Sequence, residues 1–577
     1  MSKQPFTGNP SEIIVEQLSA LGVNYLFYNS GSREARFFDA LHENPRINGI
    51  LGLHEGTVTA MAGGYTQAKS EPAVMSVHLG AGLAQSMGQL INVWAGSLPV
   101  VTLTFVGDTG SYADRITLDL GHNVGPTSIA APFMKANWTV LEAGGLTTAI
   151  ERAIKVASTP PIGPVHVAIY DRLLGTEKTS TSIIEHEIPK VTAGYPDPSD
   201  IEKLAKSLNE AERPLIYVGD GAWKSGAEST IGAIAEHFGA NIASMWGDLR
   251  GVSVAHPLHC GYFRGSVLDL NPDLIVCVGV RHGGSGTPDD YSLFKNAKNL
   301  IAIGPDVEIF ENIPDLGLTI MADETATFEL LQDLIRSENE PVTYNKKRDR
   351  AWEIAHKIKE NGRKNLQHEN ATKGSIRPMA ILDAIDTTLE KAGGGYITTE
   401  QFAIPLEYVN KKENGGKVKY VRPAGGSEGY GMGAPIGTKL GAPDQPVIGL
   451  VGDGSVYYSD SALWTAANHK IPVLYVIANN GTYGIVAGQF AAAEGAMKRE
   501  GKYAGVVLDG IEIVKLAESF GVEGIRIEEE TKIQQSIEES LDIVEREGRP
   551  LLLDVKMPLG LPQSGQASKP FHLGKSK

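Results

Sequence analysis

An aspartate and an asparagine each follow an apolar run in the last third of the chain. Asp453 stands between two glycines after the run VIGLV, and Asn480 ends an asparagine pair after VLYVIA. One helical stretch, SALWTAANHK, separates the runs, which is the pattern of a βαβ crossover. Because a crossover brings both strand ends to one edge of a sheet, we expect the two side chains to lie close together. Carboxylate and amide oxygens with a nearby turn carbonyl suit Mg²⁺, which shares its ligand shell with phosphate oxygens.

The residues around Asp453 favour a phosphate site. The flanking glycines allow close backbone approach, and the helix that follows presents an N-terminus that favours negative charge. Taken singly, GDG and NNG are more often a helix cap and a turn. Both motifs on adjacent strand ends favour the metal site instead.

Glu55 is a second candidate. It lies in LGLHEGTVTAMAGGYTQA (51–68), after an apolar run and before a helix of small residues. A carboxyl buried there tends to hold or share a proton, and it could hydrogen-bond a ring nitrogen of a cofactor. In isolation, such a glutamate is more often a capping or ion-paired residue.

The elements that must position these residues form repeated α/β units. Short apolar runs alternate with helical patterns, which is typical of parallel sheets covered on both faces. We expect strands at 24–28, 73–77, 99–106, 165–169, 214–219, 273–279, 299–304, 447–451, 473–478 and 551–555. The predicted fold class is α/β, with three doubly wound parallel-sheet domains.

Composition suggests the domain boundaries. The polar, Pro-, Gly- and Thr-rich segment 173–200 is interpreted as a linker, and a charged stretch at 336–350 as a second break. The predicted domains are 1–175, 195–340 and 370–560. The remaining tail, 561–577, is polar and locally basic, so we expect disorder unless a ligand or neighbour orders it.

Composition also limits the function. A chain of 577 residues is too long for one core, and its net charge of −16 argues against nucleic acid or anionic membrane as a partner. The N-terminus lacks a signal-peptide pattern, and no apolar run approaches membrane-spanning length. Two cysteines, Cys260 and Cys277, make a disulfide framework or zinc site unexpected. We predict a cytoplasmic protein that acts on a small molecule.

Together the motifs resemble the thiamine diphosphate enzymes of the pyruvate decarboxylase and acetolactate synthase superfamily, and benzoylformate decarboxylase in particular. The most specific segment is GDGSVYYSDSALWTAANHKIPVLYVIANNGTYG (452–484). Further support comes from YNSGSREARFFDAL (28–41), LHEGTVTAMAGGYTQA (53–68) and SVHLGAGLAQSMGQLINVW (76–94). The resemblance covers essentially the whole chain.

The resemblance implies thiamine diphosphate and Mg²⁺ as cofactors. It implies Asp453, Asn480 and the Thr482 carbonyl as metal ligands in a diphosphate-binding third domain. Glu55 would activate the cofactor from a pyrimidine-binding first domain. Other expected cofactor contacts are Gly454, Ser455, Tyr458, Gly484 and Ile485. Because the two domains meet across a dimer interface in this family, we expect a homodimer as the minimal unit and a homotetramer as the assembly.

The resemblance also suggests residues for the substrate. It implies that Ser32 binds a substrate carboxylate and that His78 is an acid–base residue, since histidine donates and accepts protons near neutrality. A satisfied buried histidine is the alternative for His78. His282, in GVRHGGSG, is either a pocket residue of the middle domain or a loop residue. Ile485, Gln489 and Phe490 should border the substrate pocket.

One position departs from the family pattern. Glu428, in AGGSEGYGMGAPIG (424–437), stands where the family carries a bulky hydrophobe that supports the bent cofactor. We favour a shifted alignment in which Tyr430 or Met432 gives that support; the alternative is an acid against the cofactor. The loop 484–503 is rich in Ala and Gly, so benzoyl specificity is not expected to carry over.

These residues predict a lyase that breaks a carbon–carbon bond in a 2-oxo or 2-hydroxyacyl substrate. The first choice is a 2-oxo acid decarboxylase; a 2-hydroxyacyl-CoA lyase and an acetolactate-synthase-like carboligase are the alternatives. The basic tail could close over a CoA-type phosphate as a lid, or stay solvated. GDGAWKSG (219–226) weakly resembles a phosphate loop, so ADP, a CoA moiety or FAD in the middle domain stays open. A non-enzymatic role would require loss of Asp453, Asn480 or Glu55, and all three are present.

Overall fold

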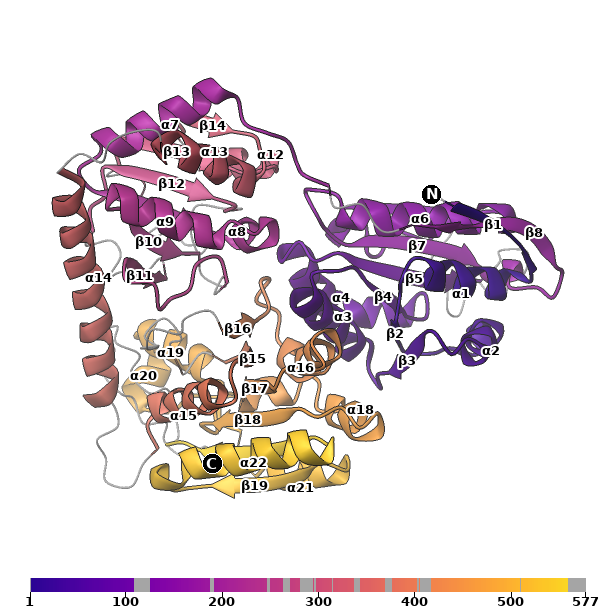
Figure 1. Ribbon diagram of the computed structural model, residues 1–577. Coiled ribbons are helices and arrows are strands. Elements are labelled where there is room, and N and C mark those ends of the chain that lie inside the picture. Colours follow the sequence, from indigo (N-terminus) through magenta and orange to yellow (C-terminus); the bar gives the residue numbers. More distant parts are fainter. Residues whose placement is uncertain are drawn as a thin grey trace.

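The computed structural model contains three six-stranded parallel sheets and one two-stranded antiparallel sheet (Figure 1). It describes residues 2–107, 125–186, 191–245, 250–262, 270–280, 294, 297–313, 315–336, 343–368, 376–401, 404, 417–508 and 510–558. The predicted α/β class with three parallel sheets is confirmed. His282 and the tail from 561 lie outside the described residues, so the predictions made for them stay predictions.

The first sheet has the strand order β3-β2-β4-β5-β7-β6. Its strands are β2 (Tyr25–Tyr28), β3 (Asn48–Leu51), β4 (Ala73–Ser76), β5 (Val100–Val106), β6 (Ala136–Val140) and β7 (Val165–Tyr170). One face packs against α1 (Pro10–Ala20), α2 (Ala35–Glu43) and α6 (Leu146–Ser158). The other packs against α3 (Glu55–Lys69) and α4 (Ala81–Ala95). The sheet is therefore covered on both faces.

The second sheet, in the middle of the chain, has the order β11-β10-β9-β12-β13-β14. Its strands are β9 (Pro214–Val218), β10 (Asn241–Ser244), β11 (His259–Tyr262), β12 (Leu274–Val278), β13 (Asn299–Ile303) and β14 (Leu318–Ile320). The helices around it are α7 (Pro198–Glu210), α8 (Asp220–Ser225), α9 (Glu228–Phe238), α12 (Val307–Glu311) and α13 (Glu324–Arg336). The long helix α14 (Thr343–His368) runs from this unit to the third one (Figure 1).

The third sheet has the order β16-β15-β17-β18-β20-β19. Its strands are β15 (Gly395–Glu400), β16 (Val418–Val421), β17 (Val447–Gly452), β18 (Leu474–Asn479), β19 (Glu523–Ile527) and β20 (Leu551–Lys556). Its helices are α15 (Pro378–Lys391), α16 (Tyr430–Gly441), α17 (Asp453–Val456), α18 (Ala462–Asn468), α19 (Gly484–Ala492), α20 (Ala496–Glu500), α21 (Ile513–Ser519) and α22 (Ile533–Glu547). Strands β17 and β18 are parallel neighbours, with Gly452 opposite Ala478. The predicted crossover is confirmed.

All ten predicted runs overlap strands, but the six edge strands and two interior strands, β10 and β15, were missed. The strands at the two edges of each sheet are β3 and β6, β11 and β14, and β16 and β19. Several of them are largely exposed or half-buried, as β19 is in EGIRI, where only Ile527 is buried. An edge strand has one neighbour and more solvent contact, so its sequence carries a weaker apolar signal.

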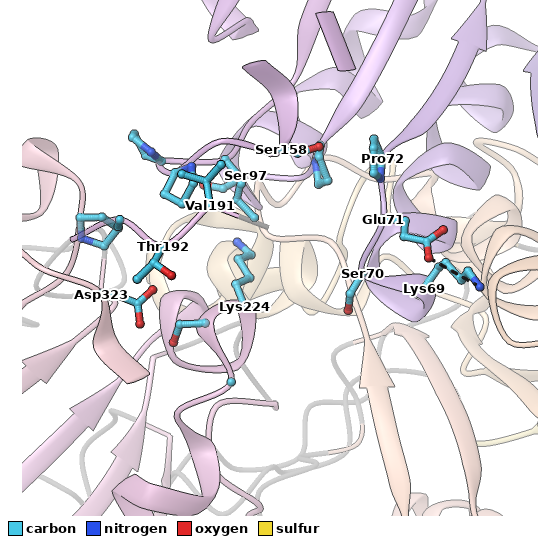
Figure 2. Close-up of a pocket in the computed structure, with 18 of the residues that line it drawn as sticks. Lys69, Ser70, Glu71, Pro72, Ser97, Ser158, Val191, Thr192, Lys224 and Asp323 are labelled. Carbon is cyan, nitrogen blue, oxygen red and sulfur yellow. Dashed lines mark ion pairs between the residues drawn. The ribbon is translucent and has the colours of Figure 1, made fainter. Parts of the chain in front are cut away.

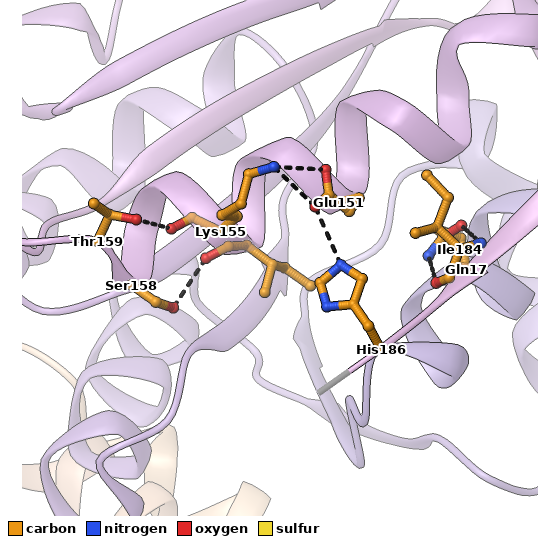
Figure 3. Close-up of polar contacts among 8 residues, drawn as sticks. Gln17, Glu151, Lys155, Ser158, Thr159, Ile184 and His186 are labelled. Atoms are coloured by element: carbon orange, nitrogen blue, oxygen red, sulfur yellow. Dashed lines mark hydrogen bonds and ion pairs between the residues drawn. The ribbon is translucent and has the colours of Figure 1, made fainter. Parts of the chain in front are cut away.

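The predicted linker 173–200 is wrong in part. It contains β8 (Thr179–Glu185), which pairs antiparallel with β1 (Ser2–Gly8). The Gln17 side chain of α1 donates to the Ile184 carbonyl at 2.8 Å and accepts from its N–H at 2.9 Å (Figure 3). His186 Nε2 lies 3.2 Å from Glu151 Oε1 (Figure 3). A two-stranded ribbon that faces solvent on one side buries only alternate side chains. Its sequence is therefore mostly polar, and this composition did not indicate a strand.

Helices α3 and α16 join the first unit to the third (Figure 1). Their backbones approach so closely that a Cβ on Gly437 would collide with the Met61 carbonyl. A Cβ on Gly64 would collide with the Ala434 carbonyl in the same way. The small residues that the sequence places in both helices therefore serve helix packing.

Among the helices of the described residues, none has the length and apolar content needed to cross a bilayer.

Candidate active site

A small cavity of about 90 Å³ lies at the carboxyl ends of β17 and β18. Its lining includes three predicted metal ligands, Asp453, Asn480 and Thr482. Other predicted cofactor contacts also line it, namely Gly454, Ser455, Gly484, Ile485 and Glu428. The βαβ crossover brings the segments at Asp453 and Asn480 together, and the segment that carries Glu428 joins them at the cavity.

The Asp453 carboxylate is buried with one oxygen unused. The backbone N–H groups of Gly454, Asn480 and Gly481 lie next to it. Burial raises its pKa to about 6, and these N–H groups oppose that rise. Oδ2 has no hydrogen-bond partner among the described residues. A buried, unsatisfied carboxylate oxygen at a strand end is suited to a cation.

Asn480 supplies a second oxygen. Its Oδ1 accepts from the Thr482 N–H at 3.2 Å, which holds the turn after β18. Among the described residues, no group of three or more His, Cys, Asp or Glu side chains gathers as a metal site. The donor set is therefore one carboxylate, one amide oxygen and backbone carbonyls, and these hard oxygen ligands fit Mg²⁺.

Asn479 holds this turn from behind. Its Nδ2 donates to Asp554 Oδ1 at 2.8 Å, and its Oδ1 accepts from Lys556 Nζ at 3.1 Å and from the Gly481 N–H at 3.2 Å. Sequence reasoning assigned no role to Asn479. Its side-chain partners, Asp554 and Lys556, come from β20, more than seventy positions away, so no local pattern identifies these contacts.

The structure places Glu428 in the cavity, in contrast to the favoured alignment. Glu428 Oε2 accepts from Ser455 Oγ at 2.7 Å. Tyr430 is buried in α16, where its hydroxyl accepts from Gln67 Nε2 at 2.7 Å, and Met432 packs in the core shared with the first unit. The turn uses Gly429 at φ 105°, a left-handed conformation that favours glycine and that aims the preceding side chain at the cavity.

Three predicted pocket residues do not line this cavity. Tyr458 is 53% exposed, and Gln489 is exposed on α19. Phe490 packs against a small core of Ala487, Tyr503 and Val506. Their predicted roles stay predictions.

The predicted catalytic residues gather at the carboxyl edge of the first sheet. Ser32 follows β2, Glu55 follows β3 and His78 follows β4, and these three strands are neighbours. A Cβ on Gly82 would lie 3.0 Å from Glu55 Oε1 and 3.3 Å from His78 Cβ, so both flank the first turn of α4. Glu55 is buried at the start of α3, and Ser32 is exposed.

Glu34 is a further member of this group that the sequence did not indicate. Its Oε1 lies 2.6 Å from His78 Nδ1, and the Glu34 side chain is 2% exposed. Its Oε2 is buried with no hydrogen-bond partner among the described residues. In the sequence, Glu34 is marked only by being a carboxyl two positions after Ser32. That position does not reveal its contact with His78, which follows the neighbouring strand.

A single chain keeps the two groups of residues apart. The lining described for the 90 Å³ cavity contains no residue of the first unit. Helix α4 lies between them: Gly82 flanks Glu55, whereas Gln89 Nε2 donates to the Glu428 carbonyl at 2.6 Å. Seven residues of α-helix span roughly 10 Å, so Glu55 stays outside the cavity.

A larger cavity of about 1140 Å³ lies between the first unit, the segment around His186 and the middle unit (Figure 2). The stretch 220–226 lines it, and Lys224 there contacts the Gly96 carbonyl and pairs with Asp220 at 3.3 Å. Its described lining holds more acids than bases: Glu71, Glu185, Asp220, Asp306, Asp323, Glu324 and Glu329 against Lys69 and Lys224. That balance disfavours an anionic ligand.

Comparison with known families gives one match for each sheet unit. Residues 9–121 match the family described as thiamine pyrophosphate enzyme, N-terminal TPP binding domain. Residues 201–331 match the central domain and residues 412–555 the C-terminal TPP binding domain of the same enzymes.

Individual relatives are similar over nearly the full length. Benzoylformate decarboxylase of Pseudomonas aeruginosa is 26% identical over 94% of this chain and 97% of its own. Acetolactate synthase isozyme 3 large subunit of Escherichia coli is 24% identical over 94% of each chain. The solved structure of a thiamine diphosphate-dependent 4-hydroxybenzoylformate decarboxylase of Rhodococcus jostii has a TM-score of 0.77 at 24% identity, over 96% of this chain and 99% of its own.

Proposed function

Because this chain belongs to the thiamine pyrophosphate enzymes, with all three of their domains, we propose that it is a Mg²⁺-dependent lyase that cleaves a carbon–carbon bond with thiamine diphosphate. The observation that carries the proposal is the buried Asp453 carboxylate, unsatisfied at Oδ2 and beside Asn480 at the ends of two parallel strands. This donor set supports Mg²⁺ as the bridge to a diphosphate.

In this proposal Asp453, Asn480 and the Thr482 carbonyl hold the metal. Ser455 and Gly454, at the N-terminal end of the short segment after β17, lie where the phosphates would be received. Bound thiamine diphosphate supplies an electron sink for breaking the bond next to a carbonyl. The protein contributes binding, orientation and proton handling.

Glu55, His78 and Ser32 carry the proton and substrate roles. Glu55 is buried next to α4, where it can hydrogen-bond a ring nitrogen and hold a proton there. Glu34 orients the His78 ring through Nδ1, and we assign to His78 the exchange of a proton with substrate oxygen. We assign the binding of a substrate carboxylate to Ser32, whose residue is exposed and follows β2 as His78 follows β4.

A 2-oxo acid decarboxylase is the first candidate reaction. A relative that is 26% identical is named benzoylformate decarboxylase, and this supports a 2-oxo acid as substrate. Similarity to acetolactate synthase keeps a carboligase as the alternative. The acyl-CoA lyase alternative rests on the tail as a lid, and the tail lies outside the described residues.

We also propose a homodimer as the minimal active unit and a homotetramer as the assembly, in the cytoplasm. The separation of Glu55 from the 90 Å³ cavity within one chain supports a site completed by a partner chain. A nucleotide in the 1140 Å³ cavity remains a lesser proposal, because its volume permits one while its acidic lining opposes phosphate.

The test is binding followed by turnover. Thiamine diphosphate should bind in calorimetry when Mg²⁺ is present and lose affinity when EDTA replaces it. The loaded protein should then release CO₂ and an aldehyde from members of a 2-oxo acid panel. Aldehyde from 2-hydroxyacyl-CoA without CO₂ would replace the decarboxylase with the acyl-CoA lyase, and absence of cofactor binding would contradict the proposal altogether.

A further inference from the structure

A buried polar pair lies next to the turn that follows β18. Its members are Asn479, the last residue of β18, and Asp554 of the neighbouring strand β20. Asn479 Nδ2 donates to Asp554 Oδ1 at 2.8 Å. Asn479 is 4% exposed and Asp554 is 0% exposed, so water does not reach this hydrogen bond. Because an unpaired buried polar group is costly, the contact fixes which atoms of the two side chains face each other.

The register of the sheet explains why these side chains meet. Asp554 lies opposite Ile477 on β18 and opposite Arg526 on β19. Side chains alternate between the two faces of a strand, so Asn479, two residues after Ile477, projects to the face that Asp554 uses. Lys556, which lies opposite Asn479, shares that face. The sheet therefore gathers one amide, one carboxyl and two cationic side chains beside the end of β18.

Every polar side-chain atom of the pair has a defined partner. Asp554 Oδ2 accepts from Arg526 Nε at 3.1 Å, which leaves Oδ1 to Asn479. Asn479 Oδ1 accepts from Lys556 Nζ at 3.1 Å and from the Gly481 N–H at 3.2 Å. A flipped Asn479 amide would set its NH₂ group against the donors of Lys556 and Gly481. These partners therefore admit one orientation of the amide.

The oriented amide holds the turn that carries two of the proposed metal ligands. The Gly481 N–H that bonds to Asn479 lies between Asn480 and Thr482 in the chain. Gly481 has a φ of 65°, a left-handed conformation that favours glycine, and its carbonyl accepts from the Leu508 N–H at 2.9 Å. Without the Asn479 contact, the backbone between the two ligands loses one of the bonds that fix its direction.

We propose that Asp554 is a positioning residue of the metal site, acting through the Asn479 amide on the turn that presents the metal ligands. Arg526 holds the second oxygen of this carboxyl and so fixes its direction. The inference rests on the proposed function, because that function makes the turn a metal-binding turn. Groups that hydrogen-bond behind the ligands of a metal set the direction of those ligands, and losing one typically weakens metal binding about 10–100-fold.

Exchanging the two side chains tests the pair directly. Asn479→Asp alone sets two carboxyl groups against each other where a donor met an acceptor. Asp554→Asn alone leaves one side-chain oxygen for two donors, Asn479 Nδ2 and Arg526 Nε. With both substitutions together, the new amide donates to the new carboxyl and accepts from Arg526, while the new carboxyl accepts from Lys556 and the Gly481 N–H. The exchanged variant therefore has a partner for each group again, whereas neither single variant does.

Calorimetry measures the effect on the metal site. Mg²⁺ is titrated into each protein at a fixed excess of thiamine diphosphate, at a temperature where circular dichroism shows a folded chain. Each single variant should bind Mg²⁺ about 10–100-fold more weakly than the wild type. The exchanged variant should recover most of the lost affinity, which two independent losses would not do. Glu523→Gln, which removes the carboxyl of an exposed ion pair with Arg549 beside the same strands, is the matched control and should retain wild-type affinity.

Thermal unfolding of the same proteins separates positioning from stability. A contact that only stabilises the sheet would lower the Tm of the single variants and leave the Mg²⁺ affinity of the folded protein unchanged, and this result would overturn the inference. So would an exchanged variant that does not fold, or that binds Mg²⁺ as weakly as the single variants. If a single variant does not fold, the exchanged variant is compared with the other single variant and with the wild type. A wild type without Mg²⁺-dependent binding of thiamine diphosphate would contradict the proposed function itself, whereas unchanged affinity in the variants of a binding wild type removes this inference alone.

Discussion

His78 Nδ1 lies 2.6 Å from Glu34 Oε1, although the two residues follow different strands of the first sheet. The Glu34 side chain is 2% exposed, whereas that of His78 is 17% exposed. A buried carboxylate thus holds one ring nitrogen of a histidine that is itself partly accessible. This is the arrangement of an orienting carboxylate and an acid–base histidine.

Replacing Glu34 with glutamine should alter catalysis through His78. A carboxylate beside an imidazole stabilises its protonated form, so its loss should move the limb of the pH–rate profile that His78 contributes to lower pH. We expect kcat/KM to fall roughly tenfold to a hundredfold, less than the full contribution of a general acid–base group, which is about 10²–10⁴. The exposed Glu142→Gln is the control. An unshifted profile would show that Glu34 is only structural.

Asp453→Asn should weaken the cofactor without unfolding the chain. Asparagine has nearly the same shape and keeps a side-chain oxygen beside the neighbouring backbone N–H groups, but it removes the negative charge that we propose binds Mg²⁺. Calorimetry should give thiamine diphosphate affinity about 100-fold weaker, or about 2.8 kcal/mol at 1.4 kcal/mol per tenfold. Asp460→Asn, outside the cavity lining, should retain affinity. Wild-type affinity in Asp453→Asn would remove this residue from the metal site.

Mixing two inactive variants tests whether the site is shared between chains. In a dimer of Glu55→Gln and Asp453→Asn chains, a shared arrangement leaves one site with both native residues. Random exchange of subunits should then restore about a quarter of wild-type activity, since half of the dimers are mixed and each has one intact site of two. A site within each chain predicts no recovery. Unmixed variants at equal concentration are the controls.

Gly437→Ala should destabilise the contact between α3 and α16. Its new Cβ would collide with the Met61 carbonyl, a backbone atom that cannot rotate away. We expect a loss of about 1–3 kcal/mol or more in the free energy of unfolding, seen as a lower Tm. Gly88→Ala in α4 is matched: its Cβ would meet only Ser427 Oγ at 3.4 Å. Gly88→Ala should leave the free energy of unfolding unchanged or raise it by roughly 0.5–1 kcal/mol.

Glu324 should make stability fall as pH rises. Burial raises its pKa to about 8 from an ordinary 4.5, so between these values the folded chain keeps a proton that the unfolded chain loses. Stability linked to this group is therefore unaffected below pH 4.5, declines from there to about pH 8, and levels off above. Glu324→Gln should flatten the dependence of Tm on pH across that window. Glu329→Gln, exposed on the same helix, should leave the slope unchanged.

The local sequence pattern was enough to predict the α/β fold class and part of the candidate site. Interior strands are buried on both faces, so apolar runs predicted ten of the twelve, among them β17 and β18. Edge strands such as β19, and the ribbon strand β8, escaped because solvent on one side relaxes the composition. Asp453 and Asn480 were predictable together because a βαβ crossover fixes where two strand ends meet.

The remaining site residues depended on tertiary contacts. Glu34 meets His78, and Ser455 meets Glu428, across segments that are distant in the sequence. The direction of Glu428 follows from the left-handed Gly429, a backbone detail that alignment alone did not supply. The sequence by itself determined the order of elements and the strand ends that carry chemistry, because hydrophobic periodicity is local. Only the tertiary structure decided which carboxyls are paired and which side chains face the cavity, because long-range packing sets side-chain direction and burial.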